Sequence, residues 1–104
     1  MDDERLYKAH ADICKTFSNP WRLRIVDTLG EGEVTVSDLS AALGISAPSV
    51  SQHLAVMRDK GVVDTRREGQ RVYYRLDNPK TLEACRLMRQ VLLEHLERSR
   101  VLLH

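Results

Sequence analysis

Hydrophobic positions near the start of the chain recur at helical spacing. Four of them follow one another at i, i+4, i+7 and i+11, the stripe of an amphipathic helix: Leu6, His10, Ile13 and Phe17. The segment "SNP" then interrupts the helix. Asn19 is suited to cap a second helix and Pro20 to begin it, because the N–H that proline lacks would be unpaired there. This second helix is predicted to run to "GEG", with Leu23, Val26 and Leu29 on one side.

The middle of the chain carries two short helical patterns with very little between them. Ser37 is expected to cap the first helix, and Gly44 can close it in the left-handed conformation. Ser46 is expected to cap the next helix, so that only Ile45 separates the two elements. Two short helices joined by so tight a turn predict a helix-turn-helix.

A hairpin and a long helix are predicted to follow. The segment "VVDTRREGQRVYYRL" alternates apolar and polar residues on both sides of "REGQ", which indicates two strands with Gly69 in the turn. From Asn78, a final helix continues to near the end of the chain, with Cys85, Met88 and Leu92 on one stripe. The predicted fold is therefore mainly α, an α+β winged helix-turn-helix in a single domain over residues 1–104.

The second helix of the helix-turn-helix has an unusual surface. Its buried stripe is expected to consist of Val50, Leu54 and Met57. The opposite side is small, polar and uncharged near its beginning, with these residues on it or at its margins: Ala47, Ser49, Ser51, Gln52, His53 and Val56. A solvated face more often carries Lys and Glu. Such a surface is suited to base edges in a DNA groove, and the helix N-terminus favours a nearby phosphate.

Charge and composition exclude several classes of protein. The formal net charge is only +1, but three arginines gather at or near the tip of the hairpin, where they are suited to contact phosphates or the minor groove: Arg66, Arg67 and Arg71. Hydrophobic residues make up 42% and charged residues 30%, which argues against disorder. No apolar run is long enough to span a membrane, and the acidic start "MDDER" is unlike a signal peptide, so a cytoplasmic protein is expected. The sequence contains no cluster of catalytic residues and no phosphate-binding glycine-rich loop, so an enzyme is not expected.

The last helix also predicts an oligomer. Its apolar face is long, and a chain of 104 residues offers no obvious further element to cover it. Pairing with the first helix and with the same elements of a second subunit would bury this face, and a twofold dimer is the commonest closed arrangement. Two groove-binding helices related by that axis would meet successive major grooves about 34 Å apart.

The chain resembles the ArsR-type winged helix-turn-helix transcriptional repressors over nearly its whole length. The similar segments are "FSNPWRLRIVDTL", "VTVSDLSAALGISAPSVSQHLAVMRDKGVV" and "REGQRVYYRL". The resemblance implies a homodimer that binds an operator of imperfect twofold symmetry and releases it when an inducer acts. It implies base or phosphate contacts from Ser46, Ala47, Ser49, Val50, Gln52, His53, Arg66, Arg67 and Arg71, and backbone contacts from Thr35 and Ser37.

The resemblance also identifies two family metal sites that this chain does not keep. One site has paired cysteines in a segment like "ELCVCDL", where this chain has "EVTVSDL" with Thr35 and Ser37. Hydroxyls do not replace thiolates as ligands of a soft metal. The other site uses an Asp, two His and a fourth acidic or His ligand, and its places hold Asn78, Lys80, Val91 and Glu94 here. The sequence therefore predicts neither site and no cofactor.

Cys14 and Cys85 are the remaining candidates for the site at which an inducer acts, and the sequence does not identify that inducer. They lie on the first and last helices, which are expected to meet at the dimer interface, and in the family such cysteine pairs respond to oxidants or reactive sulfur. Buried free cysteines are the alternative, because Cys85 lies on an apolar stripe. A further alternative is a zinc or arsenite site from His10, Cys14 and Cys85, with His95 or His104 as remote ligands. A winged helix that binds a protein instead of DNA is the rival function.

Overall fold

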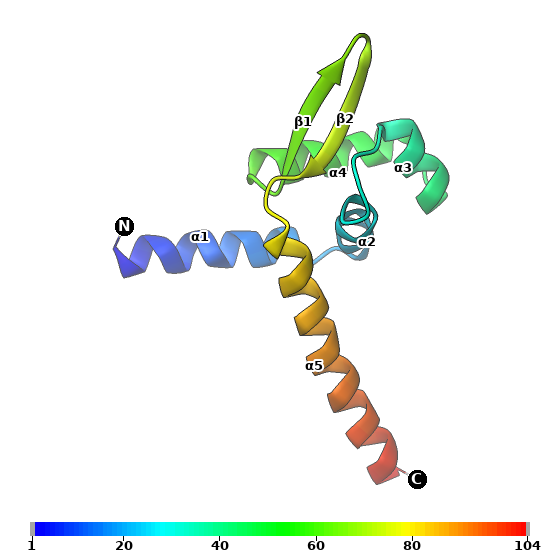
Figure 1. Ribbon diagram of the computed structural model, residues 1–104. Helices are drawn as coiled ribbons and strands as arrows, with labels where there is room; N and C mark the ends of the chain where they lie inside the picture. Colours follow the sequence, from blue (N-terminus) through cyan, green and yellow to red (C-terminus); the bar gives the residue numbers. More distant parts are fainter. Residues whose placement is uncertain (1, 104) are drawn as a thin grey trace.

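The computed structural model describes the backbone of residues 2–103 and the side chains of residues 2–100. The chain forms the helices and the hairpin in the order that the hydrophobic pattern predicts (Figure 1). The elements are α1 (Asp3–Thr16), α2 (Pro20–Leu29), α3 (Val36–Leu43), α4 (Ala47–Asp59), β1 (Val63–Glu68), β2 (Arg71–Leu76) and α5 (Lys80–Leu103). The predicted α+β winged helix-turn-helix is confirmed. His104, the remote metal candidate, lies outside the described residues.

Short polar side chains begin the helices as expected, with one exception. The Asn19 side chain accepts a hydrogen bond from Trp21 N at 2.8 Å, and Asn78 accepts one from Lys80 N at 2.9 Å. The prediction that Ser37 caps the third helix was wrong, because α3 begins two residues earlier, after Thr35.

A reciprocal capping box explains this earlier start. Thr35 Oγ1 accepts from Asp38 N at 3.1 Å, and Asp38 Oδ2 accepts from Thr35 N at 3.0 Å, so two backbone donors are satisfied at once. Ser40, which lies three residues after Ser37, cannot complete such a box at Ser37. Its hydroxyl instead donates to the Ile45 carbonyl at 2.6 Å across the turn of the helix-turn-helix.

The hydrophobic core lies where α2, α3, α4 and the base of the hairpin meet. Its buried members are Ile25, Val26, Leu29, Leu39, Val50, Leu54, Met57, Val62, Val63 and Leu82. Each large aliphatic side chain that is fully buried contributes roughly 1.5–3 kcal/mol to folding. The three that come from α4, namely Val50, Leu54 and Met57, hold that helix against α2 and α3 in one rotation about its axis.

The hairpin of β1 and β2 forms the wing. The strands pair antiparallel with Val63 opposite Leu76 and Glu68 opposite Arg71. Gly69 has φ +60° in the two-residue turn between them, a conformation that favours glycine. At the base of the wing, Tyr74 N donates to Val34 O at 2.7 Å and Val34 N donates to Tyr74 O at 3.1 Å. These two bonds fasten the wing to the segment before α3.

The outer parts of α1 and α5 extend away from this core (Figure 1). The Cα radius of gyration is 16.0 Å, against about 13 Å for a compact chain of this length. Large apolar side chains on both helices are exposed: Leu6, Tyr7, Leu87, Met88, Val91, Leu92, Leu93 and Leu96. None of the described helices is long and apolar enough to cross a membrane.

Near its beginning, α5 is fastened to α2. Arg89 donates two hydrogen bonds to the Asp27 carboxylate, at 2.8 and 2.5 Å, and this ion pair raises the pKa of Arg89. About two turns earlier on α5, Leu82 packs so closely on Gly30 that a Cβ at that glycine would overlap its side chain. The two contacts set the direction in which α5 leaves the core.

Candidate nucleic-acid interface

Burial of one side of α4 determines which residues its other side exposes. Val50, Leu54 and Met57 are each 0% exposed. The opposite side of the helix is open to solvent and consists of Ala47, Pro48, Ser51, Gln52 and Ala55. No residue of this exposed group is charged, and the first charged side chain of the helix is Arg58. The exposed face of α4 is therefore a neutral surface with hydrogen-bonding groups at Ser51 and Gln52.

The structure confirms the predicted buried stripe of α4 and adjusts which residues its exposed side presents. Val50 cannot contact DNA, because its side chain is fully buried in the core. Ser49 and Val56 are half-buried, so they lie at the margins of the exposed surface and not at its centre. Ser51, expected at a margin, and Ala55, which was not named, lie on the exposed surface. Ser51 and Ala55 are four residues apart and so share one side of the helix, which is the signal that identifies them together.

The N-terminus of α4 is formed by two serines. Ser46 Oγ accepts from Ser49 N at 3.3 Å and donates to Ser49 Oγ at 2.9 Å. The exposed residues Ser46 and Ala47 flank the first free amide groups of the helix. Free amides and the helix dipole together attract anions, so this end of α4 is suited to a phosphate oxygen.

His53 lies at one edge of the exposed face, where it is held by α2. Arg22 Nε donates to His53 Nδ1 at 3.2 Å, and Arg22 Nη1 donates to the Thr16 carbonyl at 3.3 Å. Partial burial, together with the positive charge of Arg22, lowers the pKa of His53. Because Nδ1 accepts from Arg22, the proton of the neutral ring is on Nε2, which leaves one donor for an outside partner.

The three arginines of the wing do not have equal freedom. The guanidinium of Arg66 contacts Glu33 at 3.1 Å and Glu68 at 2.9 Å, and it stacks on the ring of Tyr73 at 4.8 Å. Hydrogen bonds to the two carboxylates raise the pKa of Arg66. Arg66 therefore stabilises the wing, and its predicted role in binding phosphate competes with these intramolecular partners.

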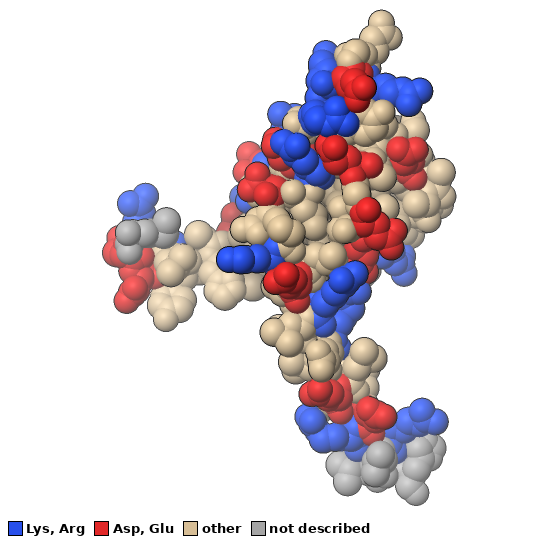
Figure 2. Space-filling view, in the orientation of Figure 1, with Lys and Arg blue, Asp and Glu red and all other residues tan. Residues whose placement is uncertain are grey.

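Arg67 and Arg71 remain free to bind an outside anion. Both side chains are exposed near the tip of the wing, and neither forms an ion pair with any side chain that the structure describes. Figure 2 shows blue side chains gathered around the wing, with red carboxylates among and below them. The hairpin that carries Arg67 and Arg71 shares a crevice with Ser51 and Ala55 of α4, so the wing lies next to the neutral face of that helix.

The two α3 residues that were expected to contact the DNA backbone differ in availability. The Thr35 hydroxyl is engaged in the capping box, whereas Ser37 is exposed in the first turn of α3. Hydrogen bonds from Thr35 lower the pKa of Asp38, and the positive charge of Arg71 adds to this effect. Asp38 is therefore ionised at neutral pH, and it places one negative charge close to Arg71.

The two cysteines are free thiols in this chain. Cys14 is exposed on α1, and Cys85 is half-buried against the core. Burial raises the pKa of the Cys85 thiol, so the thiolate is a minor species at neutral pH. Among the described side chains, no three His, Cys, Asp or Glu groups come together as a metal site. His10, Cys14 and Cys85 are thus not gathered around one point within a single chain, and His95 does not join them.

Comparison with known proteins identifies the same architecture. Residues 19–65 match the model of the arsR family of bacterial regulatory proteins. A biofilm growth-associated repressor of Xylella fastidiosa is 42% identical over 82 residues, which is 79% of this chain and 72% of the relative.

Two solved structures are similar over most of their length. One is the homodimeric winged helix-turn-helix DNA-binding domain of Mb0332 from Mycobacterium bovis, with a TM-score of 0.83 and 33% identity, covering 94% of this chain and 93% of that one. The other is reduced HlyU from Vibrio cholerae, with a TM-score of 0.75 and 33% identity, covering 85% of this chain and 93% of that one.

The lowered pKa of His53 predicts a dependence of stability on pH. The folded state binds a proton at His53 less readily than the unfolded chain does. The contribution of the neutral His53 ring to stability is therefore complete above the unfolded pKa of about 6.5 and is lost as the pH falls through the folded pKa.

Urea unfolding at two pH values tests this prediction. The unfolding midpoints at about pH 7.5 and about pH 5 should differ less for His53→Gln than for the wild type. His10→Gln, at an exposed position of α1, should keep the wild-type difference. An equal difference in His53→Gln would contradict the assignment.

Proposed function

This chain belongs to the arsR family of bacterial regulatory proteins, and we propose that it represses transcription by binding operator DNA with α4 and the wing. A transcriptional regulator of this kind is not an enzyme. The observation that carries the proposal is the neutral, solvent-exposed face of α4 next to a hairpin whose exposed arginines, Arg67 and Arg71, form no ion pair among the described side chains. Neutral polar groups can enter a groove closely, while the arginines supply the attraction to phosphate.

The exposed face of α4 suits the major groove of DNA. Gln52 carries an amide that can donate to and accept from the edge of an adenine, and Ser51 carries a hydroxyl that can do either. Ala47 and Ala55 are small enough to let the helix approach and can contact a thymine methyl group. His53 Nε2 adds one donor at the edge of this surface.

The wing and the helix termini would hold the DNA backbone. Arg67 and Arg71 are exposed beside α4 and suit phosphate or minor-groove contacts. The α4 N-terminus at Ser46 and the exposed hydroxyl of Ser37 on α3 offer two more phosphate contacts. Because the partner is double-stranded operator DNA, the protein is expected to act in the bacterial cytoplasm, and it needs no cofactor for binding.

A homodimer formed by α1 and α5 completes this function. The apolar side chains exposed on these helices include Leu92 at 52% and Leu93 at 65% in the isolated chain. A second copy would cover them, and the similar Mycobacterium bovis domain is homodimeric. A twofold axis would then place two α4 helices about 34 Å apart, so that they meet successive major grooves of an imperfectly symmetric operator.

Release of the operator is proposed to depend on Cys14 and Cys85. Both lie on the helices of the proposed dimer interface. Two thiols that lose two electrons and two protons to hydrogen peroxide form a disulfide and two waters. Polysulfide can instead bridge them through a sulfane sulfur, while a second sulfane sulfur takes up the two electrons and two protons and leaves as hydrogen sulfide. A covalent bond there would change how the two subunits meet. The raised pKa of Cys85 makes this reaction slow unless dimerisation changes the surroundings of its thiol.

The dimer is tested first. Leu92→Glu should convert the protein from twice the chain mass to the single-chain mass in sedimentation equilibrium, because a buried carboxylate without a partner is costly. Gln90→Glu adds the same charge to α5 at a position that is already polar and exposed, and it should remain dimeric. A Leu92→Glu protein that stays dimeric at micromolar concentration would refute α5 as the interface.

Operator binding is tested by two variants that should fail differently. Arg67→Ala should weaken binding to every duplex and reduce the salt slope of log K by about 1. Gln52→Ala should instead lower the preference for operator over random DNA about tenfold, since one good base contact contributes about 1–3 kcal/mol of discrimination. Fluorescence anisotropy with the DNA upstream of the gene measures both, and Arg98→Ala at the far end of α5 is the control.

The same measurement distinguishes a winged helix that binds a protein. Such a module would use the neutral face of α4 as a docking surface and would form no salt-sensitive, sequence-dependent complex with DNA. Absence of that complex for the wild-type protein would overturn the repressor proposal.

The cysteine switch is tested by release of a preformed operator complex. Peroxide or polysulfide should dissociate the wild-type complex and leave Cys14→Ser and Cys85→Ser bound, with intact mass spectrometry recording the bond. Release that persists unchanged in both variants would leave the cysteines as structural residues. If Zn²⁺ or arsenite releases the wild type but not His10→Ala, a metal or metalloid site at His10, Cys14 and Cys85 replaces the redox switch.

A further inference from the structure

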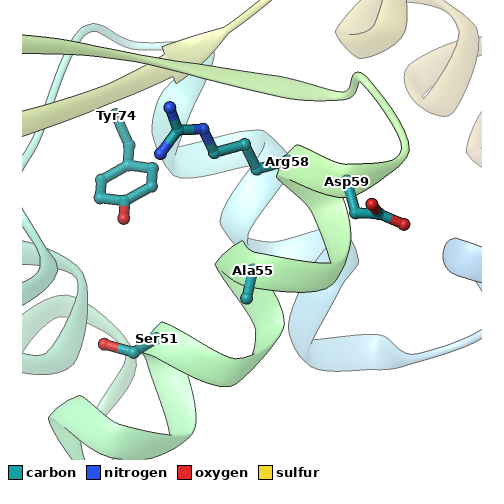
Figure 3. A pocket seen from close by; sticks show the side chains of 5 residues that line it. All are labelled: Ser51, Ala55, Arg58, Asp59 and Tyr74. Carbon is teal, nitrogen blue, oxygen red and sulfur yellow. The ribbon is translucent and has the colours of Figure 1, made fainter.

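An open crevice separates α4 from the wing. It has a volume of about 570 Å³ and is lined by Ser51, Ala55, Arg58, Asp59 and Tyr74. The first four residues come from α4, and Tyr74 comes from β2 (Figure 3). Arg58 extends from α4 toward Tyr74, and the Asp59 side chain is directed away from Tyr74 (Figure 3). The crevice therefore has a guanidinium on one wall and a phenol on the other, with Asp59 also among its lining residues.

We propose that this crevice binds one phosphodiester group of the operator, with the Arg58 guanidinium and the Tyr74 hydroxyl as donors. The inference rests on the proposed function, in which α4 occupies the major groove and the wing lies at the adjoining minor groove. One DNA strand separates two adjoining grooves, so it has to pass between the helix and the wing. The crevice is the gap between these elements, and it faces the same side as Ser51 and Ala55 of the exposed α4 surface.

The size of the lining side chains favours this occupant. Ser51 and Ala55 are the smallest side chains along this edge of α4, and they leave room for a sugar-phosphate strand to approach the helix backbone. A Ser51 hydroxyl can add a third hydrogen bond to a phosphate oxygen. A crevice meant for an apolar ligand would be closed on more sides and lined by larger apolar groups.

The charge of Arg58 is available to an outside anion. Its acidic neighbours each have another cation nearby, Asp59 with Lys60 at 3.9 Å and Asp64 with Arg75 at 3.2 Å. Hydrogen bonds to Asp64 lower the pKa of that carboxyl, and the charges of Arg75 and Arg58 add to this effect. Within the part of the chain that the structure describes, Arg58 forms no ion pair. An arginine without an internal partner, placed at a polar crevice, is suited to a phosphate because its N–H groups match the phosphate oxygens.

Tyr74 presents its hydroxyl from a fixed position. Its backbone forms two hydrogen bonds with Val34 and pairs with Thr65 across the hairpin, and its ring packs partly against the core. Little side-chain entropy is then lost when the hydroxyl binds a phosphate oxygen. Arg58 supplies the charge, and Tyr74 supplies the direction of approach.

The experiment combines protein variants with a chemically modified operator. Arg58→Gln should weaken operator binding about tenfold at low salt, as expected for loss of one charge-assisted hydrogen bond, and lower the salt slope by about 0.9. Tyr74→Phe keeps the ring in the core and should weaken binding by a smaller factor without changing the slope. Arg98→Gln removes the same charge at the far end of α5 and should bind like the wild type. Thermal unfolding checks that all three variants fold.

A scan of single methylphosphonate substitutions along the operator identifies the phosphate. Each substitution removes one negative charge, and one position per half-site should weaken wild-type binding but have no further effect on Arg58→Gln. Operator binding by Arg58→Gln with wild-type affinity and slope would overturn the inference while leaving the proposed function intact. Failure of the wild-type protein to bind any operator would instead overturn the proposed function. Additive losses at every methylphosphonate position would show that Arg58 acts only through the overall charge.

Discussion

Burial of Val50, Leu54 and Met57 is the constraint on which the DNA-binding surface depends. These side chains occupy the core between α2, α3 and the wing, and each is fully buried. Because a helix is rigid, fixing three positions on one side also fixes the direction of every residue on the other side. Ser51, Gln52 and Ala55 face outward for this reason. A repressor needs this rigidity, since a helix free to rotate would present different groups to the bases.

The second constraint is a surface that one chain cannot cover. The described part of α5 contributes Leu82 to the buried core, and beyond the contacts with α2 its apolar face is exposed. The ion pair of Arg89 with Asp27 aims α5 away from the core, which makes the helix available to a second subunit. The same contact links the proposed dimer interface to α2, and α2 in turn holds His53 on α4 through Arg22. Cys85 lies one turn before Arg89, close to this link.

Competition among charges divides the arginines into two groups. Arg66 is occupied by Glu33 and Glu68, and Arg89 by Asp27, so both stabilise the arrangement of elements. Arg67 and Arg71 have no such partners among the described side chains and are the ones suited to phosphate. Partly exposed ion pairs contribute little to stability. Their larger effect here is to decide which positive charges remain for DNA, and for that reason a net charge of +1 says little about binding.

The sequence by itself determined the order of the elements, the tight turn of the helix-turn-helix and the glycine of the wing, because helical spacing, strand alternation and capping act within a few residues. It predicted Gln52, Arg67 and Arg71 correctly as exposed groups. Helical spacing placed Val50 correctly on the buried side of α4, but the family resemblance implied a DNA contact that this burial prevents. The sequence pattern favoured Ser37 over Thr35 as a cap, and this was wrong because a capping box depends on its second member. Only the tertiary structure decided which arginines are free, how α5 leaves the core and that Arg58 faces Tyr74. Contacts such as Arg66 with Glu33 and Arg89 with Asp27 join residues far apart in the chain, and no local pattern encodes them.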